Sequence, residues 1–123
     1  MTNAPLLKLM QQHLMTVFGE KNTASRRAAI EKLYSEDCVC TDYKAEIVGR
    51  VALDEKIEAL HARYPGYVFA PTGEEDAHHN VGRMHWRFGP PAASEAITGL
   101  DIAFFENGLI RRLYVFLDKV PST

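Results

Sequence analysis

The fold is decided by residues 96–117, which read AITGLDIAFFENGLIRRLYVFL. Two apolar runs, Ala96 to Phe105 and Leu109 to Leu117, flank the tripeptide Glu106-Asn107-Gly108. Asn-Gly between apolar runs is the strongest short-range signal for a β-hairpin. The sequence therefore predicts two long antiparallel strands joined by a tight turn.

The segments before this hairpin predict further strands. Tyr67 to Pro71 and Ala77 to Phe88 are β-prone, and Gly89-Pro90-Pro91 separates the second of them from the hairpin. Earlier in the chain, Cys38 to Tyr43 predicts a strand and Glu46 to Val48 a short return strand. Long strands joined by tight turns indicate an antiparallel sheet with one buried face.

Three segments have apolar residues at helical spacing: Pro5 to Phe18, Ala24 to Tyr34 and Ala52 to Arg63. Gly19 and Pro65-Gly66 are expected to end the first and the third of these helices. Asn22 or Thr23 can cap the second, and Ser35-Glu36-Asp37 is expected to form a turn after it.

Together these elements predict an α+β fold in which three N-terminal helices pack on a strongly curved antiparallel sheet. Strands of about ten residues twist and curl, so the expected shape is a cone that encloses a pocket near one end. No repeat and no linker composition divides the chain. Residues 1–123 are therefore expected to form a single domain.

The composition is that of an ordinary globular protein, with 46% hydrophobic and 24% charged residues. A net charge of −2 and scattered basic residues argue against a nucleic-acid partner. No apolar run approaches the roughly 20 residues that cross a membrane, and no signal peptide is recognisable, so a cytoplasmic location is expected. Cys38 and Cys40 share one face of a predicted strand but are held apart by the extended backbone, so a disulfide between them is geometrically poor. They are interpreted as buried thiols.

Two stretches and the order of the elements resemble the nuclear transport factor 2-like superfamily, especially its SnoaL-like polyketide cyclase branch. The stretches are Tyr34-Ser35-Glu36-Asp37-Cys38-Val39-Cys40-Thr41-Asp42, followed by Val48-Gly49-Arg50 before a helix, and Gly99 to Arg112. The resemblance extends from about Leu6 to Asp118 and implies the cone-like fold. It does not assign an activity, because the superfamily contains isomerases, cyclases, dehydratases and non-enzymatic binding domains.

Ketosteroid isomerase is the most informative member for this sequence. The resemblance places Asp42 where that enzyme has its general-base aspartate, and Asp101 where it has a second, protonated aspartate. The enzyme also uses a tyrosine on its first helix, where this sequence offers Gln12 and His13 instead. The resemblance therefore implies a related site that differs in detail.

The residues themselves also favour Asp101 as an active group. Both faces of its predicted strand are largely apolar, so its carboxyl group is expected to be buried whichever way it points. Burial without a cationic partner raises the pKa of a carboxyl group, which suits a general acid. The alternative is a structural aspartate held by a backbone amide or by an arginine such as Arg83. Asp42 has the weaker case, because aspartate commonly stabilises turns.

The run from His78 to Phe88 is the most unusual stretch. If the run is one strand, alternate residues face the concave interior: His78, Asn80, Gly82, Met84, Trp86 and Phe88. This set is mostly apolar, with His78 and Asn80 at its polar end. His78 beside Asp101 could then shuttle a proton. Adjacent histidines on a strand point to opposite faces, so a metal site is disfavoured and no cofactor is expected.

Two further side chains, His13 and Tyr64, complete the candidate pocket. His13 lies on the inward stripe of the first predicted helix and is the nearest substitute for the missing tyrosine, although a core histidine is the alternative. Tyr64 and Trp86 would form walls of the pocket or serve simply as core aromatics.

The sequence leaves three functions open. The first is an isomerase- or cyclase-type enzyme acting on an apolar carbonyl compound, in which Asp42 abstracts a proton and Asp101, with His78 or Asn80, stabilises the enolate. The second is a non-catalytic domain that binds a small apolar molecule. The third is a dimerisation domain, since aromatic residues on the last predicted strand could form a self-complementary sheet interface. A homodimer is compatible with the first two functions and is expected.

Overall fold

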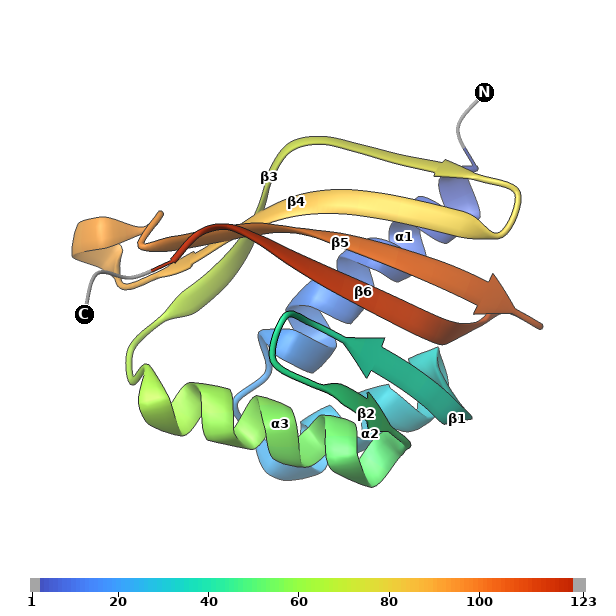
Figure 1. Cartoon of the computed structure of the whole chain (residues 1–123), viewed down its shortest axis with the longest axis horizontal. Coiled ribbons are helices and arrows are strands. Elements are labelled where there is room, and N and C mark those ends of the chain that lie inside the picture. The colour runs from blue at the N-terminus through green and yellow to red at the C-terminus, as the bar shows by residue number, and fades with distance from the viewer. Residues whose placement is uncertain (1–2, 121–123) are drawn as a thin grey trace.

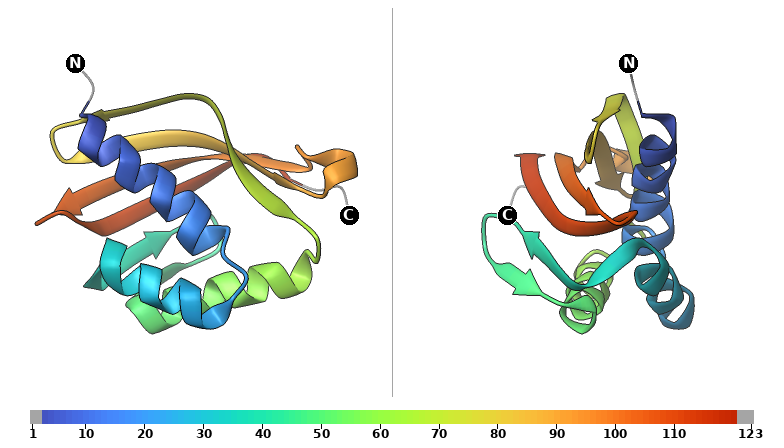
Figure 2. Two further views of the ribbon diagram at one scale, coloured as in Figure 1. Left: turned by 180° about the vertical axis from the view of Figure 1, so that it is seen from behind. Right: turned by 90° about the vertical axis from the view of Figure 1, so that its right-hand side faces the viewer.

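The computed structural model describes residues 3–120 and has the predicted α+β architecture, with helices packed on one strongly curved sheet (Figure 1). The elements follow in the order α1 (Ala4–Gln12), η1 (His13–Phe18), α2 (Thr23–Leu33), β1 (Tyr34–Thr41), β2 (Glu46–Val48), α3 (Arg50–Arg63), β3 (Val68–His78), β4 (Val81–Gly89), η2 (Pro91–Ala93), β5 (Ile97–Glu106) and β6 (Leu109–Lys119). Helix α1 runs across the sheet, while α2 and α3 lie beside β1 and β2 (Figure 2). The sheet is curved but not closed, so the cone-like fold class is confirmed.

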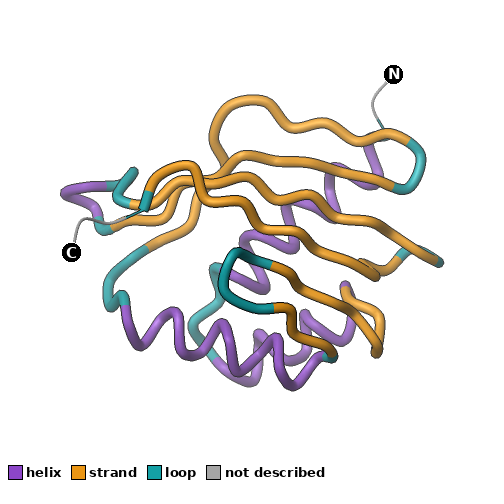
Figure 3. Tube along the Cα trace, in the orientation of Figure 1, coloured by secondary structure: helices purple, strands orange, loops and turns teal. Residues whose placement is uncertain are grey.

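The six strands are hydrogen-bonded in the order β2-β1-β6-β5-β4-β3 and form one continuous surface (Figure 3). Neighbouring strands are antiparallel except β1 and β6, which are parallel. The prediction of a wholly antiparallel sheet is therefore wrong for this pair. Parallel neighbours need a long crossover connection, and the chain between β1 and β6 supplies one through α3 and the β3–β5 meander.

The boundary between β3 and β4 also differs from the prediction. β3 continues to His78, and the chain reverses at His79, whose positive φ of 51° suits a tight turn. Gly73 does not end the strand, because it lies between Thr72 and Glu75, where the β3–β4 register shifts by a bulge. Pro71 is tolerated because β3 is the edge strand. Similarly, residues 35–37 lie within β1 and do not form the expected turn.

The first helix changes its winding at His13. Asn3 caps α1 by accepting a hydrogen bond from the amide of Leu6 at 3.2 Å. From His13 to Phe18 the helix is π-helical, and four of its six residues are buried: His13, Leu14, Val17 and Phe18. Short π-helical segments are rare and are often found at functional sites. This one directs an ionisable side chain into the core.

The inward face of β4 carries Met84, Trp86 and Phe88, all buried, as the alternation along this strand predicts. Trp86 fits because its neighbour across the ladder is Gly99. A Cβ atom at Gly99 would lie 2.4 Å from Cζ2 of Trp86, so any other residue there would displace the indole ring. This close approach fixes the ring against β5.

Among residues 3–120, no helix combines the length and the apolar character needed to cross a membrane.

Candidate functional site

A pocket of about 840 Å³ lies between α3, the β1–β2 connection and the curved sheet. Most of its wall is apolar, including Phe18, Ile57, Phe69, Phe88 and Val115. Its charged lining residues are Asp42, Lys44, Lys56, Arg63 and Asp101. A concave, mainly apolar cavity with a few convergent polar groups is the usual form of a small-molecule site.

Asp101 is the most deeply buried charged residue of this lining, with 3% of its surface exposed. Its Oδ1 accepts a hydrogen bond from Nε1 of Trp86 at 2.8 Å. Its Oδ2 lies 2.7 Å from Nε2 of His13. The carboxylate is therefore held by two N–H groups in an otherwise apolar wall, as a buried charge requires.

Behind Asp101, His13 is fully buried and its Nδ1 is hydrogen-bonded to the hydroxyl of Tyr34. Burial, followed by the proximity of Cys40 and Asp101, raises the pKa of Tyr34 well above 10, so its hydroxyl keeps its proton. In neutral His13 one ring nitrogen accepts and the other donates. The arrangement that satisfies all three groups has Tyr34 donating to Nδ1 and Nε2–H donating to Asp101.

Asp42 also lines the pocket, but its carboxylate is occupied. The backbone amides of Lys44 and Ala45 both donate to Oδ1 at 2.9 Å, and the ammonium group of Lys56 donates to Oδ2. Burial alone would raise the pKa of Asp42, but these hydrogen bonds outweigh it, so the pKa lies below its ordinary value. Asp42 thus fixes the β1–β2 turn and orients Lys56.

His78 and Asn80 do not lie where the sequence suggested. Both are exposed, and His78 Nε2 lies 3.1 Å from a carboxylate oxygen of Asp76. The placement of His78 next to Asp101 is wrong because the β3–β4 turn falls at His79, which removes both residues from the inward face of β4. Arg83 is not the partner of Asp101 either, since it is exposed on the outer face of the sheet.

The remaining predicted pocket residues divide into two groups. Tyr64 and Trp86 line the pocket. Met84 is fully buried in the core, and His13 contacts the pocket only through Asp101. Among residues 3–120, no cluster of three or more His, Cys, Asp or Glu side chains is arranged to hold a metal ion.

Sequence patterns miss two members of the site. Tyr34 has the spacing of the last apolar residue of the second helix, but it begins β1 and contributes the tyrosine hydroxyl that the first helix lacks. Lys56 has only a weak signal in the sequence. That signal is its position on the helix that follows Val48-Gly49-Arg50, one turn before Leu60.

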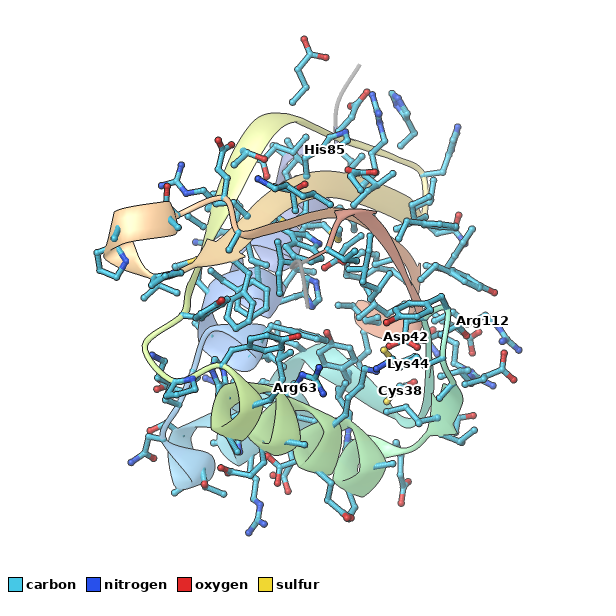
Figure 4. All side chains as sticks on the ribbon, turned by 60° about the vertical axis from the view of Figure 1, so that its left-hand side comes forward. Cys38, Asp42, Lys44, Arg63, His85 and Arg112 are labelled. Carbon is cyan, nitrogen blue, oxygen red and sulfur yellow. The ribbon has the colours of Figure 1, made fainter. Side chains whose placement is uncertain are left out.

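Cys38 and Cys40 are free thiols with 2% and 3% exposure, which confirms their interpretation as buried side chains. Burial raises the pKa of Cys40 to about 12. Neither thiol lines the pocket, so the described site contains no cysteine nucleophile. In Figure 4, Asp42 and Lys44 lie next to each other and Arg63 projects from α3, while His85 lies away from them at the other end of the sheet.

Comparison of the sequence with family models and with curated proteins gives no match. Solved structures do match. A candidate isomerase of the SnoaL-like family from Agrobacterium tumefaciens shares 26% identity at a TM-score of 0.87, covering 94% of this chain and 99% of its own. A candidate ketosteroid isomerase from Kribbella flavida shares 16% identity at a TM-score of 0.73, covering 98% of this chain and 82% of its own. A candidate SnoaL-like polyketide cyclase from Jannaschia shares 7% identity at a TM-score of 0.77, covering 95% of this chain and 88% of its own.

The chain thus has the cone-like fold of nuclear transport factor 2-like proteins, with a few polar groups on the wall of its pocket. The resemblance to the SnoaL-like and ketosteroid isomerase-like members of that superfamily is confirmed at the level of the fold.

Proposed function

We propose that the pocket binds a small, mostly apolar carbonyl compound and that Asp101 transfers a proton at the carbon next to the carbonyl group. The observation that carries this proposal is the Asp101 carboxylate, held by His13 and Trp86 on the wall of an apolar pocket. A carboxylate shielded from water interacts strongly with a developing charge and needs little solvent reorganisation to react.

In the proposed step, Asp101 takes a proton from the α-carbon. The C–H bond breaks, an O–H bond forms on the carboxyl group, and the electron pair moves to the carbonyl oxygen as an enolate. Lys56, a cation on the pocket wall, would stabilise that oxygen. In a β,γ-unsaturated substrate, return of the proton from Asp101 to the γ-carbon completes an isomerisation. Alternatively, the enolate carbon attacks a second carbonyl carbon and closes a ring, and the alkoxide that forms takes the proton from Asp101.

This proposal exchanges the roles that the resemblance gave to the two aspartates. Asp42 is poorly suited to be the base, because two amides and an ammonium group already occupy its oxygens and lower its pKa. His13 and Tyr34 act as positioning residues behind Asp101, because the imidazole N–H orients one carboxylate oxygen and the Tyr34 hydroxyl orients the imidazole.

The proposal can be tested without knowing the product. A panel of apolar ketones and β-keto esters is incubated with the protein in D₂O, and deuterium uptake at the α-carbon is followed by NMR. Acceleration over buffer for at least one compound is expected. Compounds that bind in the pocket and exchange no faster than in buffer would contradict the enzymatic proposal.

The positioning role of His13 has its own signature. His13→Phe leaves the Asp101 carboxylate with the Trp86 donor alone. The rate of α-deuterium uptake should therefore fall while the affinity of the pocket for its ligand stays unchanged, and His13→Gln, whose amide can donate to Oδ2 of Asp101, should restore part of the rate. A merely structural histidine would lower the amount of folded protein without changing the rate per folded molecule.

A non-catalytic binding domain is the second candidate function. It is favoured by the fact that both Asp101 oxygens are already hydrogen-bonded within the protein, as in a structural aspartate. Binding of an apolar molecule without any proton exchange would support this alternative.

We also propose that two copies of the chain associate through the outer face of β5 and β6. On this face, Leu100 lies across the ladder from Phe116, and Ile102 lies across from Tyr114. The rings of Phe104 and Tyr114 are in edge-to-face contact, with their centroids 6.0 Å apart. Phe104 and Phe116 are 39% and 54% exposed. A contiguous exposed apolar patch of this kind is typical of an interaction surface, and a two-fold dimer would bury it against itself.

Replacing Phe104 with lysine is expected to weaken this dimer at least tenfold, because a buried ammonium group would replace an aromatic contact. Sedimentation at micromolar concentration should show twice the mass of one chain for the wild type and the mass of one chain for the variant. Val51→Lys is the matched control, since Val51 is 74% exposed on α3, away from this face. A monomeric wild type would contradict the proposed association.

A further inference from the structure

The pocket has an uneven distribution of charge. Asp101 lies at its deep end, where it is almost fully buried. Lys44 and Arg63 are exposed, so these two cations lie towards the open end, whereas Lys56 is half-buried on the wall and paired with Asp42. Two positive charges are therefore in excess at the mouth, opposite a negative charge at the deep end.

Lys44 and Arg63 form no ion pair with a carboxylate of residues 3–120. Nζ of Lys44 lies 5.6 Å from the ring centroid of Tyr43, and Cζ of Arg63 lies 5.4 Å from the ring centroid of Tyr64. Arg63 also donates from Nε to the Tyr64 hydroxyl at 3.1 Å. Both tyrosines line the pocket. The rings hold the two cations beside the opening by cation–π contact and leave most of their N–H groups free.

From this arrangement we infer that the ligand is an amphipathic organic anion, with an apolar body and one carboxylate, sulfonate or phosphate group at the mouth. The apolar body fills the pocket, and the anionic group binds Lys44 and Arg63. Asp101 repels a second anion, so the uncharged end of the ligand points to the deep end. This inference rests on the proposed function, because it assumes that the pocket is a ligand site.

A matched pair of fluorescent probes tests it. 8-Anilinonaphthalene-1-sulfonate and N-phenyl-1-naphthylamine share one ring system, and only the first carries a charge. The anionic probe is expected to bind about five- to tenfold more tightly at low salt, and this preference should shrink as salt screens exposed charges. The Lys44→Gln/Arg63→Gln double variant should lose the preference and bind the neutral probe as the wild type does.

Arg112→Gln is the control, because Arg112 is exposed on the outer face of the sheet opposite Phe104. Loss of anionic-probe binding in this variant, and not in the double variant, would move binding to the outer face and overturn the inference. Equal affinity of the wild type for both probes would overturn the charge preference and leave the proposed function standing. Failure of both probes to bind would overturn the pocket as a ligand site and the proposed function with it.

Discussion

Asp101→Asn is expected to lower the rate of α-deuterium uptake by about two to four orders of magnitude, the usual contribution of a positioned general base. The amide cannot accept a proton at the pH at which the carboxylate can. Asp42→Asn, by contrast, is expected to lower the rate less than about tenfold, because Asp42 acts only by holding Lys56 and the β1–β2 turn.

The amide side chain of the Asp101→Asn variant should fit without disturbing the fold. Its oxygen can accept from Trp86, and its NH₂ group can donate to Nε2 of His13, whose Nδ1–H then donates to the Tyr34 oxygen. Unchanged near-ultraviolet circular dichroism and unchanged binding of the neutral probe would verify this. If the folded Asp101→Asn variant kept the full exchange rate, or if Asp42→Asn lost more of that rate, Asp101 would not be the general base.

Local sequence signals predict the parts of the fold that depend on local chemistry. Asn107 and Gly108 both have positive φ, at 55° and 79°, as a tight hairpin turn requires. The sequence misplaces the β3–β4 turn because His79 is a less recognisable turn residue than Gly73, which forms a bulge instead. The parallel β1–β6 pairing cannot be read from either strand, since it depends on how distant segments meet.

The candidate site shows the same division. The buried position of Asp101 and the inward direction of His13 follow from strand and helix periodicity. Their contact joins residues 88 positions apart and depends on the crossing of η1 over β5. Tyr34 lies at the junction of α2 and β1. If the helix ended one residue later, Tyr34 would be helical and its side chain would point in a different direction.

Arg26→Met is expected to lower the free energy of unfolding by about 3–5 kcal/mol, the usual result of breaking a buried ion pair. Arg26 is fully buried and links α2 to α3. Its Nε donates to Asp54 at 2.7 Å, Nη2 to Glu58 at 2.6 Å and Nη1 to the carbonyl of Glu20 at 2.9 Å. For a domain of this size the loss corresponds to a fall of about 10–20 °C in Tm.

Arg27→Met is the matched control for this prediction. Arg27 donates to the other oxygen of the same carboxylate, Asp54 Oδ2, at 2.8 Å, but its side chain is 68% exposed. Exposed ion pairs contribute about 0–1 kcal/mol, so the control should unfold nearly as the wild type does in urea. Equal effects of the two replacements would show that burial of Arg26 is not what makes its contacts strong.

The pH dependence of unfolding separates the charge of Arg26 from its packing. Burial would raise the pKa of Asp54, but hydrogen bonds from Arg27 and Arg26 outweigh it and hold the pKa below 3.8. A carboxyl group with a lowered pKa in the folded state stabilises the fold above its unfolded pKa, and this stabilisation is lost as the pH falls. Wild-type stability should therefore decrease below about pH 4.

In Arg26→Met the decrease should be shallower, because the Asp54 carboxylate is then paired only with the exposed Arg27. An unchanged slope would mean that Arg26 stabilises the contact between α2 and α3 through packing alone.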